Sequence, residues 1–242
     1  DRAADGYVRS EARGIVFLEN FALHHENSLR GVPLIFMAGS AVNQDGRSAS
    51  LTAPNGPSQQ WTLRAALRNA KIESNDICRL QMHGTGTALG DPIEFGSILA
   101  VYCRISSSAV WNSRNRYHDR LTPASITVQS VKSWVGHSET AAGSVGIATI
   151  LQGLFDVAAM PILHLGGINM HIVSFIASET KKNTGTMPLR PAVPRQRNCA
   201  PFQKGENEMG EYQGVSGFAF QGTNAHLVII QKCRRSLGDK CQ

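Results

Sequence analysis

The sequence predicts an α/β protein, and three observations lead to this fold class. Strand-like alternation of β-branched and polar residues runs directly into helical spacing over residues 124–157. The 242-residue chain is 42% apolar, enough for a core in one large domain or two small ones. Its 23 glycines and 7% aromatic residues suit tight turns better than a surface for stacking nucleic-acid bases.

In the first eighty residues, short apolar or β-branched runs bounded by turn residues predict strands. They are residues 6–20 (two short strands, the second, 14–18, apolar enough to be buried), 33–42 and 77–82. Residues 43–56 are rich in Asn, Asp, Gly and Pro and predict a loop structured by turns. A helix is expected from about residue 57 to 72, with three apolar residues on one face: Leu63, Leu67 and Ala70.

Residues 83–94 read HGTGTALGDPIE. Asp91, Pro92 and Glu94 fit the N-cap, N1 and N3 positions of a helix that runs to about residue 103. A capping box therefore explains Asp91 and Glu94 without any chemistry. It leaves three polar residues on glycine-spaced backbone unexplained: His83, Thr85 and Thr87.

Residues 124–131 predict a strand that ends in a turn carrying Lys132 and His137, and a helix is expected over 139–157. Reactive side chains of α/β proteins often lie on such strand-to-helix turns. Ser138 fits the N-cap, which places His137 at the positive end of the helix dipole. That position favours a neutral ring able to donate an N–H bond. The alternative is a loop histidine that only caps the helix.

Residues 140–163 are nearly uncharged and resemble a membrane span in composition. Several residues argue against a span: Gln152, Asp156, Pro161 and the glycines at 143, 146 and 153. A helix that is apolar all round in a water-soluble chain is buried on both sides. We therefore expect this helix to lie between two sheets.

The remaining segments are assigned from composition. Residues 104–123 are polar, basic and unpatterned, which predicts a surface insertion, and residues 169–211 are expected to be mostly loop. Two strands, 214–220 and 225–230, close the chain and are joined by residues 221–224.

The formal net charge of +6 leaves three interpretations open. Solvated basic loops and a basic tail are the simplest, and a docking surface for an acidic partner comes second. Nucleic-acid binding is the weakest, because no binding motif accompanies the charge.

Five cysteines, an odd number, form no CxxC pair and no cluster of metal-ligand spacing. They favour a reducing, cytoplasmic location, although an organelle remains open. The chain begins without Met or an apolar leader, which suggests that it was cut from a longer sequence.

Three ordered stretches resemble the C-terminal half of a β-ketoacyl synthase, the ketosynthase domain of modular polyketide synthases and related fatty acid synthases. They are HGTGTALGDPIE (83–94), SVKSWVGHSETAAG (130–143) and GFAFQGTNAH (217–226). Residues 4–14, 43–59 and 161–169 match that family as well. Several long motifs in the right order are far more specific than a lone pattern.

The resemblance implies a thiolase-like layered fold in which two similar α/β halves stack as helix–sheet–helix–sheet–helix. The apolar helix after His137 would be one of the central-layer helices. Residues 1–22 would end the N-terminal half, and residues 23–232 would form the C-terminal half with an insertion at about 104–123. Residues 233–242 would be a basic tail.

The resemblance also implies an acyltransferase that performs a decarboxylative Claisen condensation in polyketide or fatty acid biosynthesis. An acyl thioester would react with a malonyl-type extender on an acyl carrier protein. No metal or redox cofactor is implied, since phosphopantetheine arrives attached to the carrier. The full enzyme would be a homodimer that binds no nucleic acid and has no membrane span.

One departure from the family concerns the nucleophile. The family's catalytic cysteine lies in a Thr-Ala-Cys-Ser-Ser context in the first half, and none of the five cysteines here has that context. The missing N-terminal half is therefore an expected partner, and this chain alone is expected to be inactive. A non-catalytic ketosynthase remnant or interaction module is the alternative from another class. A biosynthetic thiolase is disfavoured by HGTGT followed by GDPIE.

The match assigns catalytic roles by position. His83 and His137 correspond to the two histidines that activate the malonyl thioester. Lys132 corresponds to the lysine that orients them and Glu94 to its carboxylate partner, whereas Asp91 is expected to be structural.

The match also assigns residues that contact the substrate. Thr85 and Thr87 correspond to threonines that bond the pantetheine arm, although turn satisfaction alone also explains them. The backbone N–H of Phe220 would complete the acyl oxyanion hole, with Phe218 near the acyl channel. The family usually has glycine at the positions of Ala219 and Gln221.

Overall fold

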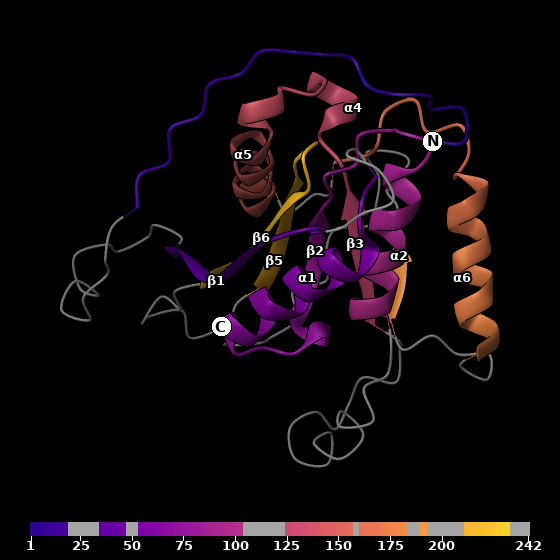
Figure 1. Ribbon diagram of the computed structural model, residues 1–242. Helices are drawn as coiled ribbons and strands as arrows, with labels where there is room; N and C mark the ends of the chain where they lie inside the picture. Colours follow the sequence, from indigo (N-terminus) through magenta and orange to yellow (C-terminus); the bar gives the residue numbers. More distant parts are fainter. Residues whose placement is uncertain are drawn as a thin grey trace, which may run out of the picture.

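The computed structural model describes residues 1–18, 34–46, 53–103, 124–156, 160–182, 189–192 and 211–232. These residues form one six-stranded sheet with helices on both faces (Figure 1). The strands are β1 (Leu34–Gln44), β2 (Ile77–Gln81), β3 (Ala124–Gln129), β4 (Leu189–Ala192), β5 (Glu211–Phe218) and β6 (Thr223–Lys232). The α-helices are α1 (Gly56–Ala70), α2 (Gly90–Tyr102), α4 (Lys132–Val135), α5 (Ala142–Asp156) and α6 (Met170–Lys182).

The sheet has the strand order β1-β6-β5-β2-β3-β4. Strands β5, β2, β3 and β4 run parallel to one another, whereas β6 runs antiparallel to β5 and β1 antiparallel to β6. The expected α/β class is therefore confirmed. The carboxyl ends of parallel strands meet at one edge, so the turns after β2 and β3 lie close together.

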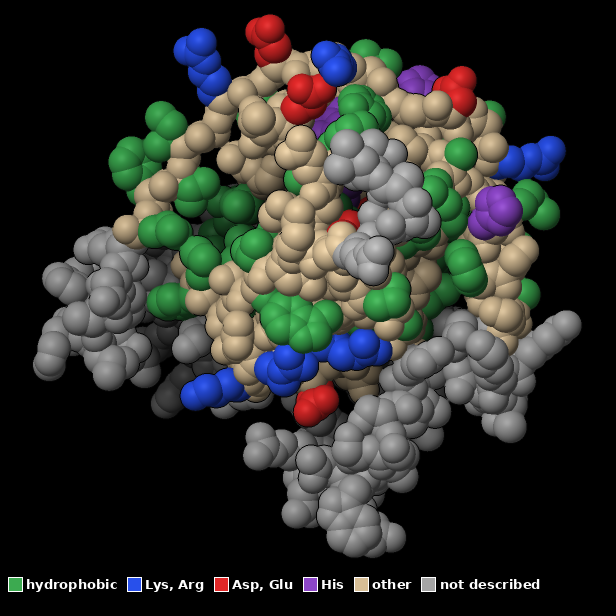
Figure 2. Space-filling view, viewed as in Figure 1, with side chains coloured by type: hydrophobic (Ala, Val, Ile, Leu, Met, Phe, Trp, Pro, Cys, Tyr) green, Lys and Arg blue, Asp and Glu red, His purple; other side chains and the backbone are tan. Residues whose placement is uncertain are grey.

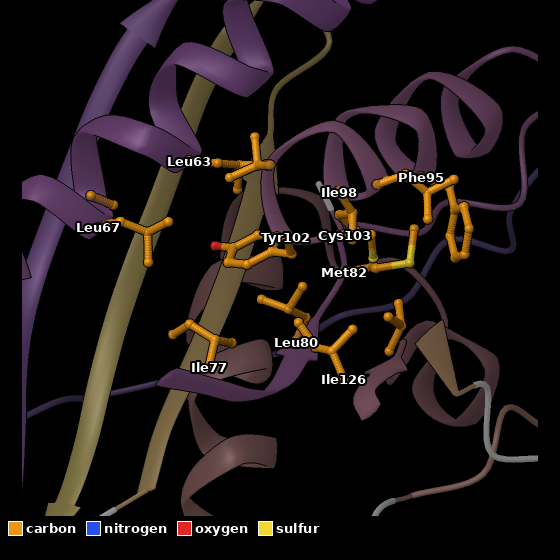
Figure 3. Packing of buried hydrophobic residues seen from close by; sticks show 14 of the residues in the cluster. Leu63, Leu67, Ile77, Leu80, Met82, Phe95, Ile98, Tyr102, Cys103 and Ile126 are labelled. Carbon is orange, nitrogen blue, oxygen red and sulfur yellow. The ribbon is translucent and has the colours of Figure 1, made fainter. Parts of the chain in front are cut away.

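The larger part of the core lies between α1, α2 and one face of the sheet (Figure 3). Its best buried side chains include Leu63, Leu67, Ile77, Leu80, Phe95, Ile98, Tyr102 and Ile126. The predicted helix near 57–72 is α1, capped by Asn55, whose side chain accepts a bond from the Ser58 amide. Gly39 of β1 lets this helix approach, because a Cβ there would lie 2.7 Å from the Ala66 carbonyl oxygen.

Helix α5 covers the other face of the sheet, where Gly146 lies against Val215 and Gln81. The predicted helix over 139–157 is confirmed as a short 3-10 turn (Glu139–Ala141) followed by α5. The expected place between two sheets stays a prediction, because a second sheet would have to come from the other half of the layered fold. The described residues supply one sheet, and from Ala142 to Gln152 most residues keep some exposure, with Ile150 as the fully buried anchor. No helix in the described ranges is long and apolar enough to cross a membrane.

The N-terminal strap (residues 1–18) corrects a second expectation. Instead of two strands it forms an extended arch with one isolated bridge, between Arg9 and His137 (Figure 1). Ile15 is 82% exposed and Phe17 93%, so the segment that was expected to be buried is open to solvent (Figure 2). A strand requires a run of backbone hydrogen bonds to a neighbouring strand, and over residues 6–18 the described part of the chain provides only this bridge.

The expectation of mostly loop over 169–211 is also wrong where the structure describes that segment. Asn169 starts α6 by accepting bonds from the amides of His171 and Val173, and Ile172 is buried. Strand β4 contains Pro191, which an edge strand tolerates. The expected insertion (104–123) and basic tail (233–242) lie outside the described residues, and the proposed domain boundaries stay predictions.

Candidate active site

Four rings from four separate chain segments form a row. Tyr7 of the strap lies 4.7 Å from His137, measured between ring centroids, at an interplanar angle of 65°. His137 lies 5.3 Å from His83 at 84°, and His83 lies 5.9 Å from Phe218 at 58°. Three of these residues were predicted from sequence. Tyr7 was not, because nothing in its local pattern connects it to a histidine 130 positions later.

His137 is held through its backbone and its ring. Its amide donates to the Val8 carbonyl at 2.8 Å, and its own carbonyl accepts from the Ser10 amide at 3.1 Å. Its Nδ1 accepts a bond from the Glu139 amide at 3.1 Å, so the proton of the neutral ring lies on Nε2. Ser138 stands at the N-cap position of the 3-10 turn, but its side chain makes no capping bond.

Both histidines are neutral at pH 7. Burial lowers the pKa of His83 to about 3. Lys132, and His137 whenever its ring is protonated, act in the same direction. Burial also lowers the pKa of His137, helped by Lys132 and opposed by the Glu139 carboxylate. A neutral imidazole keeps one N–H, so the pair is suited to donate hydrogen bonds rather than to release protons.

The turn after β2 is tied down by side chains from α2 and α4. Glu94 accepts from the amides of His83 at 2.7 Å and Gly84 at 2.8 Å, and Asp91 accepts from the Gly86 amide at 2.9 Å. From the other side, Lys132 Nζ donates to the His83 carbonyl. The sequence predicted Glu94 and Lys132 as site residues and Asp91 as a structural residue.

The capping box expected at Asp91 and Glu94 does not form. The N-cap of α2 is Leu89, and the carboxylates of Asp91 and Glu94 bond the preceding turn instead of the start of their own helix. Lys132 and Glu94 form no direct ion pair within the described ranges. Both instead bond the backbone at His83, Glu94 through the amides of His83 and Gly84 and Lys132 through the His83 carbonyl. Buried carboxylates reach loop amides that a helical pattern does not reveal.

The charges that hold the turn are themselves perturbed by burial. Burial raises the pKa of Glu94 to about 7, against the effect of its two amide bonds. Burial lowers the pKa of Lys132, against the attraction of Glu94 and Asp91. Strong desolvation at clustered ionisable groups is typical of functional sites.

The two threonines of the turn bond each other. Thr85 Oγ1 lies 3.3 Å from Thr87 Oγ1, and Thr87 Oγ1 also accepts from the Gly90 amide at 3.1 Å. Thr87 therefore provides a hydrogen-bond acceptor for the first amide of α2, the purely structural role that the sequence left open for it. The two glycines that alternate with these residues, Gly84 and Gly86, have positive φ values of 47° and 73°, a backbone conformation that favours glycine.

Phe220 lies in the turn between β5 and β6 and is 73% exposed. Its amide has no hydrogen-bond partner in the described part of the chain, whereas those of Ala219 and Gly222 are bonded within the turn. Within this turn, residues 219–222, Gly222 is the one residue with a positive φ, of 87°. Ala219 and Gln221 therefore fit their backbone without strain.

The same turn is anchored by a residue that sequence reasoning did not assign. Asn224 donates to Asp45 Oδ1 at 2.7 Å and to Asn43 Oδ1 at 3.0 Å, which joins β6 to the end of β1 and to the residue that follows it. An open cavity of about 390 Å³ lies beside this loop at the start of α1. It is lined by Asn43, Asn55, Pro57, Ser58 and Trp61 and does not include the row of rings.

Comparisons with known proteins agree with this geometry. Residues 34–166 match the family described as "Beta-ketoacyl synthase, C-terminal domain". The chain is 36% identical over 229 residues to the spectinabilin polyketide synthase system protein NorA' of Streptomyces orinoci, covering 94% of this chain and 5% of that protein. It is also 36% identical over 228 residues to mycoketide-CoA synthase of Mycobacterium tuberculosis, covering 94% and 5%.

Solved structures give the same assignment. The ketosynthase from module 6 of the bacillaene synthase of Bacillus subtilis 168 is similar with a TM-score of 0.59 and 26% identity, over 82% of this chain and 32% of that one. The oxazolomycin ketosynthase domain OzmH KS7 of Streptomyces albus JA3453 has a TM-score of 0.61 and 28% identity, over 82% and 30%. The chain thus belongs to the β-ketoacyl synthase family, as the C-terminal domain found in modular polyketide synthases.

Proposed function

We propose that this chain carries the malonyl-activating part of a ketosynthase active site. The observation that carries the proposal is the pair of neutral histidine rings, His83 and His137, 5.3 Å apart at the edge where β2 and β3 end. Two N–H donors that converge in a partly buried site suit an oxygen that gains negative charge during a reaction.

In the proposed step, the bond between the carboxylate and the α carbon of a malonyl-type thioester breaks and CO2 leaves. The electron pair forms an enolate whose charge lies on the thioester oxygen, and the N–H groups of His83 and His137 stabilise it. The enolate carbon then attacks an acyl thioester on a cysteine, so that a carbon–carbon bond forms and the cysteine leaves as thiolate. The product is a β-ketoacyl thioester.

The other residues of the site position these donors. Lys132 and Glu94 fix the peptide of His83 from its two ends, which keeps the ring at a constant distance from His137. Thr85 and Thr87 offer hydroxyls to a pantetheine arm, and the unpaired Phe220 amide offers a donor to the acyl carbonyl. The proposed partners are an acyl carrier protein and a first ketosynthase half, within a homodimer.

This chain spans about 5% of the length of the spectinabilin and mycoketide relatives, and in this proposal the nucleophile comes from a segment outside it. No cysteine of the 242 residues has the family's nucleophile context, so the chain alone should form no β-ketoacyl product from acyl and malonyl carrier proteins. Formation of that product would overturn this division of labour. It would mean that one of the present cysteines carries the acyl group.

The decisive experiment uses a ketosynthase domain completed by the first half of a related polyketide synthase. His83→Ala and His137→Ala should each lower malonyl decarboxylation about 100-fold or more, the scale for one oxyanion donor. Acylation of the cysteine should stay intact in both variants. His171→Ala, at an exposed position on α6, is the matched control. Unchanged decarboxylation in both histidine variants would favour a non-catalytic remnant or interaction module.

A further inference from the structure

The strap contacts the site at more points than its single bridge suggests. Besides the two backbone bonds to His137, Arg9 Nε lies 3.1 Å from a Glu139 carboxylate oxygen. A Cβ on Gly136 would lie 2.9 Å from the Val8 carbonyl oxygen, so only glycine allows the strap to pass this closely. The strap therefore touches the residue before His137, His137 itself and the residue that bonds its ring.

The strap also passes the turn that carries His83. A Cβ on Gly86 would lie 2.8 Å from the carbonyl oxygen of Gly6, which is the residue before Tyr7. At its start, Arg2 donates through its amide to the Gly167 carbonyl at 2.8 Å. Residues 2–10 are thus held across both histidine-bearing turns, whereas Ile15 and Phe17 further along are exposed.

Two contacts fix the His137 ring. The Glu139 amide donates a hydrogen bond to Nδ1. Glu139 makes this bond with a φ of 49°, a left-handed conformation that is unusual for a residue with a side chain. The Tyr7 ring meets the His137 ring in a T-shaped contact at 4.7 Å, an arrangement that aromatic rings prefer. If the imidazole turned over about its Cβ–Cγ bond, Cδ2 would take the place of Nδ1. The Glu139 amide would then lose its acceptor, and the Nε2–H group would point elsewhere.

We propose that Tyr7 is a positioning residue of this site, which holds the imidazole of His137 so that Nε2 carries the proton and faces the substrate. The inference rests on the proposed function of His137 as an N–H donor. The ring of Tyr7, and not its hydroxyl, makes the contact. Phenylalanine should therefore replace it, and an aliphatic residue of similar size should not.

The first test needs no substrate. In the chain of 242 residues with ¹⁵N-labelled imidazoles, NMR correlations through the ring report which nitrogen carries the proton, and His137→Gln identifies the signal. The wild type and Tyr7→Phe should show one tautomer with the proton on Nε2, whereas Tyr7→Leu should show a mixture. Phe17→Leu, the same type of change at an exposed strap position, is the matched control and should match the wild type.

Folding is monitored in the same spectra, because the buried His226 gives its own signal. If Tyr7→Leu disturbs that signal, Tyr7→Met serves instead, since its flexible side chain fills the space without a ring. A pure Nε2–H tautomer in a folded Tyr7→Leu or Tyr7→Met chain would overturn the inference. So would an equal mixture in Phe17→Leu.

The second test separates this inference from the proposed function. In the completed ketosynthase domain, Tyr7→Leu should lower kcat for malonyl decarboxylation by about two- to tenfold, as expected for one aromatic pair, with KM and cysteine acylation unchanged. Tyr7→Phe should restore the rate. If His137→Ala lowers the rate and Tyr7→Leu does not, Tyr7 has no positioning role. If His137→Ala has no effect, the proposed function itself is wrong.

Discussion

A buried histidine outside the active site gives the sharpest prediction about stability. His226 of β6 is 2% exposed, with Nε2 at 3.1 Å from the Tyr102 hydroxyl and Nδ1 at 3.0 Å from the Ser216 hydroxyl. Burial lowers its pKa from 6.5 to about 3. Between about pH 3 and pH 6.5, the His226 imidazole therefore binds a proton in the unfolded chain but not in the folded chain. Stability is lost as pH falls below about 6.5.

The size of the effect follows from proton linkage. One proton bound only by the unfolded state changes the free energy of unfolding by about 1.4 kcal/mol per pH unit. From pH 6.5 to pH 5, His226 should therefore cost about 2 kcal/mol. His83, whose pKa is also lowered to about 3, adds a loss of the same sign. Glu94, whose pKa is raised to about 7, contributes a gain as pH falls.

The variant His226→Gln isolates one of these contributions, because the other groups titrate equally in both proteins. Urea unfolding at pH 7 and pH 5 gives the loss for each protein, and the loss in His226→Gln should be smaller by about 2 kcal/mol. The glutamine amide can still bond the hydroxyls of Tyr102 and Ser216. His171→Gln, at an exposed position, should leave the loss unchanged. An equal loss in wild type and His226→Gln would refute the argument.

Two further predictions concern packing and surface. Gly39→Ala should lower the free energy of unfolding, measured with urea, by about 1–3 kcal/mol, because the new methyl group would meet the backbone of α1 at Ala66. Gly217→Ala is the control: its methyl group has open space, and the free energy of unfolding should not change. Equal effects of the two changes would contradict the close approach. The exposed strap should make the chain bind a hydrophobic dye, and Ile15→Ser with Phe17→Ser should reduce the fluorescence without lowering the melting temperature. A wild-type chain that binds no dye would show that the strap is covered.

Most of the fold could be predicted from local patterns. Apolar runs, alternation and helical spacing predicted β1, β2, β3, α1 and α5 within a few residues of their bounds, and signals for a helix start predicted α2. Helix α6 was missed because the prolines at 188, 191, 194 and 201 led the whole of 169–211 to be assigned as mostly loop. Its apolar residues at helical spacing, Ile172 and Ile176, could have revealed it. The strap was predicted as strands because it has the right composition, although a strand also needs a partner.

The sequence by itself determined the family, and it predicted the two histidines whose rings meet in the structure, through motifs whose residues are neighbours along the chain. What those residues bond was decided by tertiary structure. Glu94 sits where a capping box would use it, yet it bonds the amides of His83 and Gly84. Tyr7 contacts His137 across 130 residues. A local pattern indicates the conformation that a segment prefers. A side chain, however, bonds the unsatisfied polar group that the fold brings within reach, and that group can come from any part of the chain.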